Sequence, residues 1–256
     1  MFVKAPFGRR SCEAVDLAVH SLKDTPHRPG ASRRPGRRPP REDPRDVVVA
    51  RGGPDPRRAA RRLGRRTGSP RRAAQLHALG LGLEVRDIQG NVDSRLAKVA
   101  SRRYDAVVLA RAGLARLGRA DEVSEILDPL QVCRPRARAL AVECRAGDVE
   151  IAAQLGALDD PASRACVTAE RVVLADLEAG CAAPVGALAE VVEGDDGEEL
   201  WLRAVALSPD GGLSIRLSAS GPVPDAAGVG HRLAALMLDE GAATLMTAPP
   251  PRRQHA

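Results

Sequence analysis

Three polar side chains whose types could support chemistry stand together near the start of the chain: Ser21, Lys23 and Asp24. They follow residues 15–20, where apolar and other side chains alternate as in a strand, and Pro26 ends that strand because it lacks an N–H group. Open α/β sheets bind ligands at the carboxyl ends of their strands. A carboxylate there can stabilise a developing positive charge or carry a proton, whereas the plainer interpretation is an ordinary solvated turn.

A second group of candidates stands at the start of an expected helix. The segment reads Thr67-Gly-Ser-Pro-Arg-Arg72, and the Thr and Ser ahead of the helix supply a cap and free N–H groups, which suit an anion. Arg71 and Arg72 put positive charge at the positive end of that helix, which is unfavourable unless an anion binds there. The pattern therefore predicts a carboxylate or phosphate beside Thr67, Ser69, Arg71 and Arg72.

Two further arginines follow expected turns. Gly90-Asn91 forms a turn ahead of a helix that carries Arg95, and an apolar strand over residues 104–110 runs into a turn and helix that carry Arg116. Both arginines become candidates for an anionic ligand through the family resemblance given below, since a guanidinium can hold a carboxylate by two parallel hydrogen bonds. For Arg116 the alternative is a single exposed charge.

The cysteines differ in their surroundings. They lie at 12, 133, 144, 166 and 181, an odd number without a Cys-x-x-Cys pair, so neither a disulfide framework nor a zinc site is indicated. We expect Cys144 and Cys166 to be small buried side chains. Cys181 lies between Gly180 and Pro184 on an expected loop, where a thiolate would be accessible as a nucleophile.

Strands and capped helices must position these groups. Val15, Leu17 and Val19 are expected to be buried, residues 47–50 read as a short buried strand, and residues 104–110 are typical of a parallel sheet. Further along, the pattern predicts a small α+β domain with a three-stranded antiparallel sheet. Its elements are a helix over 160–178, strands over 187–192, 200–207 and 213–218, and a helix over 226–239. Residues 55–64 are expected to be helical.

Composition bounds the class of protein. The chain has 256 residues, 44% of them hydrophobic, which is enough for one to three domains with real cores. No apolar run is long enough to span a bilayer and the N-terminus lacks a signal-peptide pattern, so we expect a cytoplasmic protein without a membrane partner. The net charge is +6, and all but three of the 39 Lys and Arg residues are Arg, which suits an anionic partner but also follows from GC-rich codons.

Two segments are of low complexity. Residues 27–40 are rich in Arg, Pro and Gly and cannot bury an apolar face, so alone they should be disordered, as should the tail at 249–256. An Arg-rich nucleic-acid arm at residues 28–41 is an alternative function. Aromatic residues make up only 2% of the chain, which leaves few side chains for stacking on bases, and nucleic acid is therefore not the expected partner.

Five blocks, in order, resemble one family. They are Asp16-Leu-Ala-Val-His-Ser-Leu-Lys-Asp-Thr-Pro26, the segment at 67–72, Gly90-Asn-Val-Asp-Ser-Arg-Leu96, the segment at 104–118, and Leu177-Glu-Ala-Gly-Cys-Ala-Ala-Pro-Val-Gly186. Together they are similar to the porphobilinogen deaminase family, also called hydroxymethylbilane synthase, over about residues 2–245. Any one block is weak evidence, but the five in order are specific.

The resemblance implies an α/β fold. It comprises two doubly wound, periplasmic-binding-protein-like domains with a cleft between them, the first incomplete, plus a small C-terminal α+β domain. The implied bounds are 1–44 with 134–158 for domain 1, 45–133 for domain 2 and 159–248 for domain 3. The charged segment at 41–46 marks the crossing from domain 1 to domain 2. The family is usually monomeric, and we expect the same here.

The resemblance also implies a reaction: four porphobilinogen molecules condense head to tail to hydroxymethylbilane, with release of ammonia at each step. A dipyrromethane cofactor is joined covalently to the cysteine that matches Cys181. On this resemblance Asp24 is the catalytic residue. The remaining implied contacts are with the cofactor, from Lys23, Asp24, Ser69, Arg71 and Arg72, and with the substrate, from Ser21, Thr67, Arg95 and Arg116.

The sequence departs from the family pattern at several places. The family's opening strand–helix–strand–helix is absent, Gln89 replaces an arginine, Arg66 replaces a glycine, and residues 136–138 replace a glycine loop. Three Arg/Pro/Gly/Ala-rich segments lead to the hypothesis of short frame-shifted readings of GC-rich DNA. Because strands of domain 1 are absent, an exposed sheet edge and poor solubility are also expected. The alternative functions are a non-catalytic anion-binding relic and the Arg-rich nucleic-acid binder.

Overall fold

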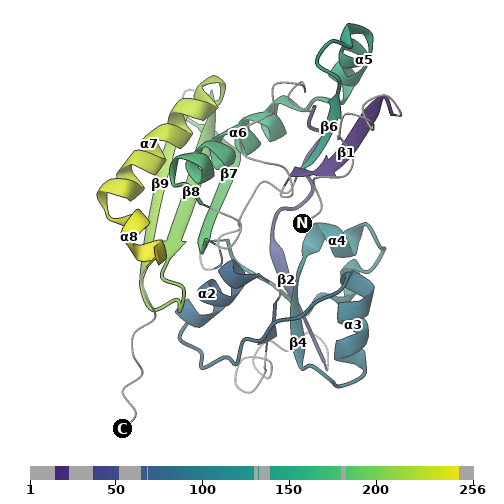
Figure 1. Cartoon of the computed structure of the whole chain (residues 1–256), viewed down its shortest axis with the longest axis vertical. Coiled ribbons are helices and arrows are strands. Elements are labelled where there is room, and N and C mark those ends of the chain that lie inside the picture. Colours follow the sequence, from purple (N-terminus) through teal and green to yellow (C-terminus); the bar gives the residue numbers. More distant parts are fainter. Residues whose placement is uncertain are drawn as a thin grey trace.

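The computed structural model describes residues 15–22, 37–51, 65–67, 69–129, 132, 139–179, 183–195 and 197–247. Within these ranges the chain forms three separate sheets with helices packed around them (Figure 1). The expected helix at 55–64 and the expected disordered tail at 249–256 lie outside the described residues. Among the described residues, no helix combines the length and apolar character that a membrane span requires.

The first sheet has two strands that are distant in sequence. Strand β1 (Leu17–Ser21) pairs antiparallel with β6 (Leu140–Cys144), with Leu17 opposite Cys144 and Ser21 opposite Leu140. A short helix α5 (Val149–Gln154) and a 3₁₀ turn η3 (Leu155–Leu158) follow β6. The sheet thus joins the start of the chain to its middle.

The burial expected for the first strand is wrong. Val15, Leu17 and Val19 are 43%, 43% and 56% exposed, while Ala18 and His20 on the opposite face are half-buried. The alternation correctly predicted a strand with one apolar face. It could not tell whether another layer covers that face, and the described residues place none there.

The central sheet is mixed, with strand order β3-β4-β2-β5. Strand β2 runs antiparallel to β4 and β5, while β3 runs parallel to β4. The expected strands at 47–50 and 104–110 are confirmed, but the parallel pairing expected for the second holds only toward β3. The strand bounds are β2 (Asp46–Ala50), β3 (Arg65–Arg66), β4 (Ala106–Ala110) and β5 (Glu125–Ile126).

Helices cover both faces of the central sheet, which explains its continuous apolar strands. On one face Val47, Val49 and Val107 pack against Leu96 and Leu114 from the helices α3 and α4. On the other face Val48 and Val108 pack against Leu76 of α2. The bounds are α2 (Pro70–Ala78), α3 (Val92–Ala100) and α4 (Arg111–Ala115), followed by the 3₁₀ turn η2 (Ala120–Glu122).

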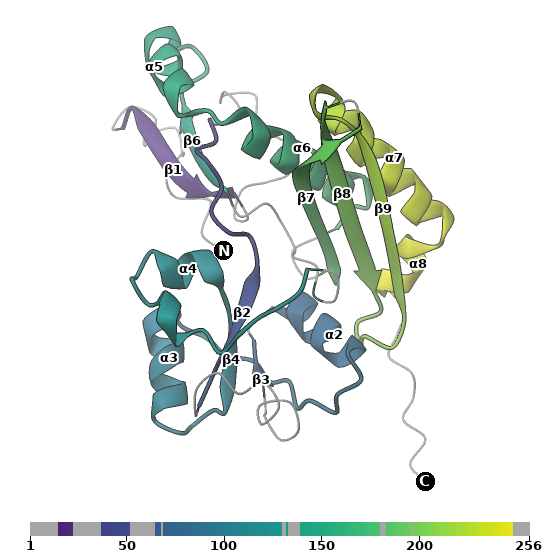
Figure 2. The same cartoon turned by 180° about the vertical axis from the view of Figure 1, so that it is seen from behind.

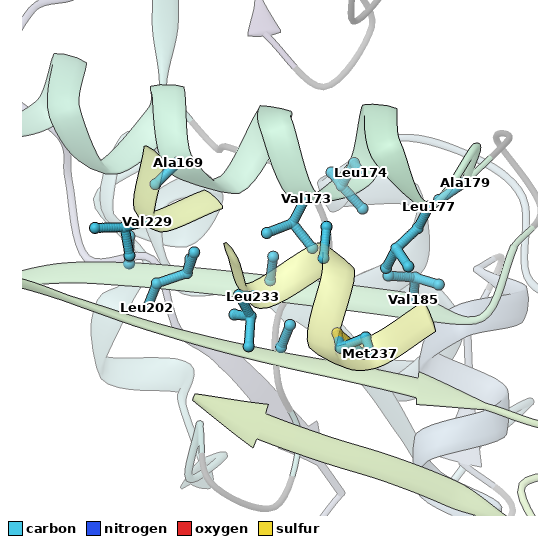
Figure 3. Packing of buried hydrophobic residues seen from close by; sticks show 14 of the residues in the cluster. Ala169, Val173, Leu174, Leu177, Ala179, Val185, Leu202, Val229, Leu233 and Met237 are labelled. Carbon is cyan, nitrogen blue, oxygen red and sulfur yellow. The ribbon is translucent and has the colours of Figure 1, made fainter. Parts of the chain in front are cut away.

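The C-terminal α+β domain is confirmed as an antiparallel sheet of order β7-β8-β9 with helices on one face. Leu202 of β8 points into a core with Val173 of α6 and Leu233 and Met237 of α7 (Figure 3). Asp160 caps α6 as expected, because its side chain accepts a hydrogen bond from the Ser163 N–H at 2.8 Å. The bounds are α6 (Pro161–Asp176), β7 (Val185–Gly194), β8 (Gly197–Leu207), β9 (Ser214–Pro222), η4 (Val223–Asp225), α7 (Ala226–Asp239) and α8 (Ala242–Thr247).

Helix α2 lies between two sheets, and both views show it beside the C-terminal sheet as well as the central one (Figures 1 and 2). Ala74 packs against Leu188, Val205 and Leu207 on the face of the C-terminal sheet that α6 and α7 leave open. Leu76 faces the central sheet. The first turn of α2, which carries Arg71 and Arg72, is therefore held from both sides.

The segment at 37–45 connects the sheets through hydrogen bonds. The N–H of Arg38 donates to Asp159 Oδ1 at 3.0 Å, and Arg37 exchanges backbone hydrogen bonds with Val142. The Arg41 guanidinium donates to the buried Glu170 carboxylate at 2.7 Å. The disorder expected for 27–40 is thus wrong for residues 37–40. Hydrogen-bond partners in β6, in α6 and at Asp159, which follows η3, hold this segment without apolar contacts.

Candidate functional site

A cavity of about 320 Å³ lies between the two-stranded sheet and the helices of the central sheet. Ser21 and Leu140 line it from β1 and β6, Arg72 from α2, Arg95 from α3, and Arg116 from the turn after α4. The volume is at the lower end of typical small-molecule sites. The other lining residues are Gly90, Asn91, Val92, Leu109, Ala110, Ala112, Gly113 and Ala139.

Arg72 is held rigidly by a carboxylate of this chain. Its Nε and Nη2 donate to the two oxygens of Asp46 at 2.7 and 2.9 Å, and its Nη1 donates to the Val108 carbonyl at 3.3 Å. Both partners of the ion pair are buried. Asp46 therefore already compensates the charge of Arg72, one of the two arginines at the start of α2 that predicted an external anion.

Among the three arginines that line the cavity, Arg95 has a buried donor nitrogen without a hydrogen-bond partner in the described part of the chain. Asn91 caps α3 by accepting the Ser94 N–H at 2.9 Å, and Arg95 follows one position later in the first turn. Its Nε is buried and has no hydrogen-bond partner among the described residues. Burial, together with the charge of Arg72, lowers the pKa of Arg95 from its ordinary value. A carboxylate in the cavity would relieve both conditions, since it would accept from Nε and add a negative charge.

Arg116 is paired, but in an exposed position. Its Nε donates to Glu42 Oε1 at 3.1 Å, and the two side chains are 49% and 41% exposed. Glu42 belongs to the connecting segment, whereas Arg116 follows α4 directly. Solvent screens such a pair strongly, so this guanidinium can exchange its partner at little cost.

The other site candidates near the start of α2 do not line the cavity. Thr67 is fully buried, and its N–H donates to the Arg86 carbonyl at 3.0 Å. Ser69 stands at the N-cap of α2 but makes no side-chain capping bond, and Arg71 is half-buried. The structure therefore brings together Ser21, Arg72, Arg95 and Arg116 of the expected site, but not Thr67, Ser69 or Arg71.

Three expected site residues lie outside the described residues: Lys23, Asp24 and Cys181. Cys144 and Cys166 are buried, as expected. Burial, with the charge of Glu170, raises the pKa of the Cys166 thiol to about 11. Cys166 would therefore be unreactive at neutral pH. Within the described part of the chain, no group of three or more His, Cys, Asp or Glu side chains could hold a metal ion.

Two carboxylates that pair with arginines of the cavity were not predicted from the sequence, in which their segment indicated only a domain boundary. Asp46 pairs with Arg72, and Glu42 pairs with Arg116. The sequence did carry a signal for Asp46, because it directly precedes the apolar run Val47–Val49, and a carboxylate buried with such a run needs a partner. Glu42 gave no comparable signal.

The chemistry of the cavity suits a ligand with several carboxylates. Three guanidinium groups line it, and one of them has a buried Nε without a partner. A dipyrromethane built from pyrroles with acetate and propionate side chains is such a ligand, so the described residues fit its charged groups. The point of covalent attachment expected at Cys181 lies outside the described residues.

Comparisons of the sequence with known proteins match two domains of one family. The model of the porphobilinogen deaminase, dipyromethane cofactor binding domain, matches residues 2–153, and that of the porphobilinogen deaminase C-terminal domain matches residues 164–239. Among solved structures, YhfZ from Shigella flexneri is 16% identical and covers 65% of this chain and 70% of its own, with a TM-score of 0.30 that carries no conclusion.

Curated relatives match nearly the whole chain. Porphobilinogen deaminase from Mycobacterium tuberculosis (strain ATCC 25618 / H37Rv) is 53% identical over 253 residues, which cover 93% of this chain and 80% of the relative. The protein of that name from Mycobacterium leprae (strain TN) is 52% identical, covering 91% and 76%, and that from Nocardia farcinica (strain IFM 10152) is 49% identical, covering 96% and 73%. The chain belongs to the porphobilinogen deaminase family.

Proposed function

We propose that this chain binds porphobilinogen in the described cavity and condenses four molecules of it to hydroxymethylbilane, releasing ammonia at each step. Membership of the family supports the reaction. The observation that carries the proposal is the meeting of Arg72, Arg95 and Arg116 around one cavity, where the buried Nε of Arg95 has no partner among the described residues. Each porphobilinogen brings two carboxylates to such a site.

The proposed roles divide the cavity. Arg95 and Arg116, with Ser21, would hold the substrate, and Arg72 would hold the cofactor together with Lys23 and Asp24. Thr67, Ser69 and Arg71, which do not line the cavity, would support the start of α2 that carries Arg72. Bidentate pairs between guanidinium groups and carboxylates give both affinity and orientation, which Arg95 and Arg116 can supply. Arg72, whose fork already binds Asp46, would add only its fixed positive charge.

Asp24 would act on the reacting pyrrole. It follows Ser21, which lines the cavity, by three positions in the sequence. When ammonia leaves, positive charge develops on the ring, and a carboxylate beside the pyrrole nitrogen stabilises that charge and can hold the proton released. The dipyrromethane, joined to Cys181, would supply the primer pyrrole to which the first unit is added, and each later unit would be added to the free end of the growing chain.

The proposed architecture follows the family. Domain 1 would comprise residues 1–44 with 134–158 and domain 2 residues 45–133, both of periplasmic-binding-protein-like form. Domain 3, residues 159–248, would carry the cofactor. The position of the cavity between the β1–β6 sheet and the central sheet supports a cleft between domains 1 and 2. We further propose a cytoplasmic monomer.

The test is the intact mass of the purified protein, with peptide mapping at Cys181. The expected result is an added mass of about two linked pyrroles on the Cys181 peptide. Cys181→Ala should remove that mass, whereas Cys166→Ala, at a buried thiol, should retain it. A Cys181 that stays unmodified after incubation with porphobilinogen would overturn the proposed reaction and favour a non-catalytic anion-binding protein.

A further inference from the structure

We propose that Glu42 is an internal competitor for Arg116, so that a ligand carboxylate reaches this guanidinium only by exchanging with Glu42. Glu42 would thereby set the affinity of the cavity for its second carboxylate. The inference rests on the proposed function, because it concerns the same cavity and the same carboxylate-bearing pyrroles.

The three cations that line the cavity differ in what already holds them. Arg72 cannot exchange its partner, because releasing Asp46 would leave a buried carboxylate without a counter-ion. Arg95 has a buried Nε without a partner among the described residues, so a first carboxylate meets no competitor there. Among these three, only Arg116 is paired with an exposed carboxylate of the chain, Glu42, which a ligand carboxylate could replace.

The backbone keeps Glu42 close to Arg116. The preceding residue, Arg41, is anchored to α6, because its N–H donates to Ser163 Oγ at 2.9 Å and its guanidinium to Glu170. The following residue, Asp43, is anchored by Arg45 and by Arg111 at the start of α4. Between these two anchors the side chain of Glu42 can leave Arg116 while its backbone stays in place. Its local concentration at Arg116 is therefore high, and a ligand must compete with it.

The expected effect is modest, because the pair is exposed. Replacing Glu42 by Gln removes the competing charge and also its repulsion of the ligand carboxylates. We expect affinity to rise about two- to ten-fold, which is the range for one exposed ion pair plus a nearby like charge. The gain should shrink as salt is raised from about 0.05 to about 0.5 M, since both contributions are screened.

The experiment is isothermal titration calorimetry of the full-length chain. The probe is a pyrrole that bears one acetate and one propionate but no aminomethyl leaving group, so binding is measured without turnover. Glu42→Gln should bind the probe about two- to ten-fold more tightly than the wild type. Glu84→Gln is the matched control, because Glu84 is an exposed carboxylate paired with Arg86 and neither lines the cavity. It should leave the affinity unchanged.

A double-mutant cycle tests whether the effect passes through Arg116. Arg116→Gln should weaken binding, and adding Glu42→Gln to that variant should change affinity by less than about two-fold. An equal gain in both backgrounds would overturn the proposal, and so would an unchanged or weaker affinity in Glu42→Gln alone. If the wild type binds no probe and Cys181 also stays unmodified, the proposed function itself fails. A loaded Cys181 with no effect at Glu42 rejects this inference alone.

Discussion

Arg72 and Asp46 show how one buried pair links folding to the site. The guanidinium lines the cavity, yet both hydrogen bonds of its fork go to Asp46 at the first position of β2. A buried ion pair contributes little net stability as a pair, because its desolvation offsets the attraction. Removing one partner of the pair is strongly destabilising, because the remaining charge then stays buried without a counter-ion.

We therefore predict that Asp46→Asn lowers the free energy of unfolding by about 3–5 kcal/mol. Urea unfolding followed by circular dichroism would measure the loss. The control is Asp105→Asn, which breaks the exposed pair with Arg51 and should cost less than about 1 kcal/mol. Equal losses in the two variants would show that Arg72 does not depend on Asp46.

Asp43 should make stability depend on acid pH. Burial alone would raise the pKa of its carboxyl, but hydrogen bonds from Arg45 and the charges of Arg45 and Arg111 outweigh burial and lower that pKa to about 2. A carboxyl with a lowered pKa in the folded state binds protons more readily when unfolded. Its stabilisation is complete above the ordinary pKa of about 4 and is lost as the pH falls toward about 2.

The corresponding variant is Asp43→Asn. It should be less stable than the wild type at pH 7, and the difference should shrink steadily between about pH 4 and about pH 2. Urea unfolding of both proteins at pH 7, 4, 3 and 2 would measure this difference in the free energy of unfolding. A constant difference over this range would mean that the ion pairs of Asp43 contribute nothing to stability.

At the scale of elements, local patterns predicted structure well where neighbours in sequence decide it. Asp160 ahead of Pro161 gave the start of α6, and alternation gave β7, β8 and β9. The same reasoning failed for the apolar face of β1, which is exposed. It also missed the partner of Arg72, because Asp46 lies 26 residues earlier in the chain. Both depend on contacts between distant segments, which no local pattern encodes.

The meeting of α2 with the C-terminal sheet is such a distant contact. The turn between β8 and β9 lies against the last turns of α2, where a side chain at Gly211 would stand 2.2 Å from the Ala74 carbonyl oxygen. Gly211 also has a positive φ of 77°. This turn therefore supports the helix whose first turn carries Arg71 and Arg72.

We predict that Gly211→Ala lowers the unfolding free energy by about 1–3 kcal/mol more than Gly82→Ala does. Gly82 is the matched control, because its φ of 65° imposes similar backbone strain but its added methyl group would meet no atom within 4 Å. Thermal or urea unfolding would compare them. Similar losses would mean that the turn yields easily and does not fix the position of α2.

For the molecule as a whole, the site depends on all parts of the chain. Arg72, Arg95 and Arg116 come from three helical segments around the central sheet, and Ser21 comes from the two-stranded sheet. The C-terminal sheet supports α2. The sequence predicted these individual residues and the C-terminal domain, because each lies in a local pattern. It did not predict which arginines would share a cavity, since that depends on how the sheets pack.

The exposed face of β1 should govern how the whole molecule behaves in solution. Val15, Leu17 and Val19 form an apolar row on a strand whose second edge is unpaired among the described residues. Apolar edge strands promote self-association, because another strand can add its backbone hydrogen bonds and cover the row. We therefore expect the monomer to self-associate as its concentration rises, so that the wild type sediments as a monomer at low concentration and as larger species at high concentration.

Lysine on this face should reduce that association. The double variant Leu17→Lys with Val19→Lys adds two charges to the row, so pairing of two copies would bring like charges together. Sedimentation velocity at several concentrations should show mainly monomer. Leu213→Lys is the control, because Leu213 is 65% exposed but lies outside β1, and it should associate like the wild type. A wild type that stays monomeric at every concentration would contradict this prediction.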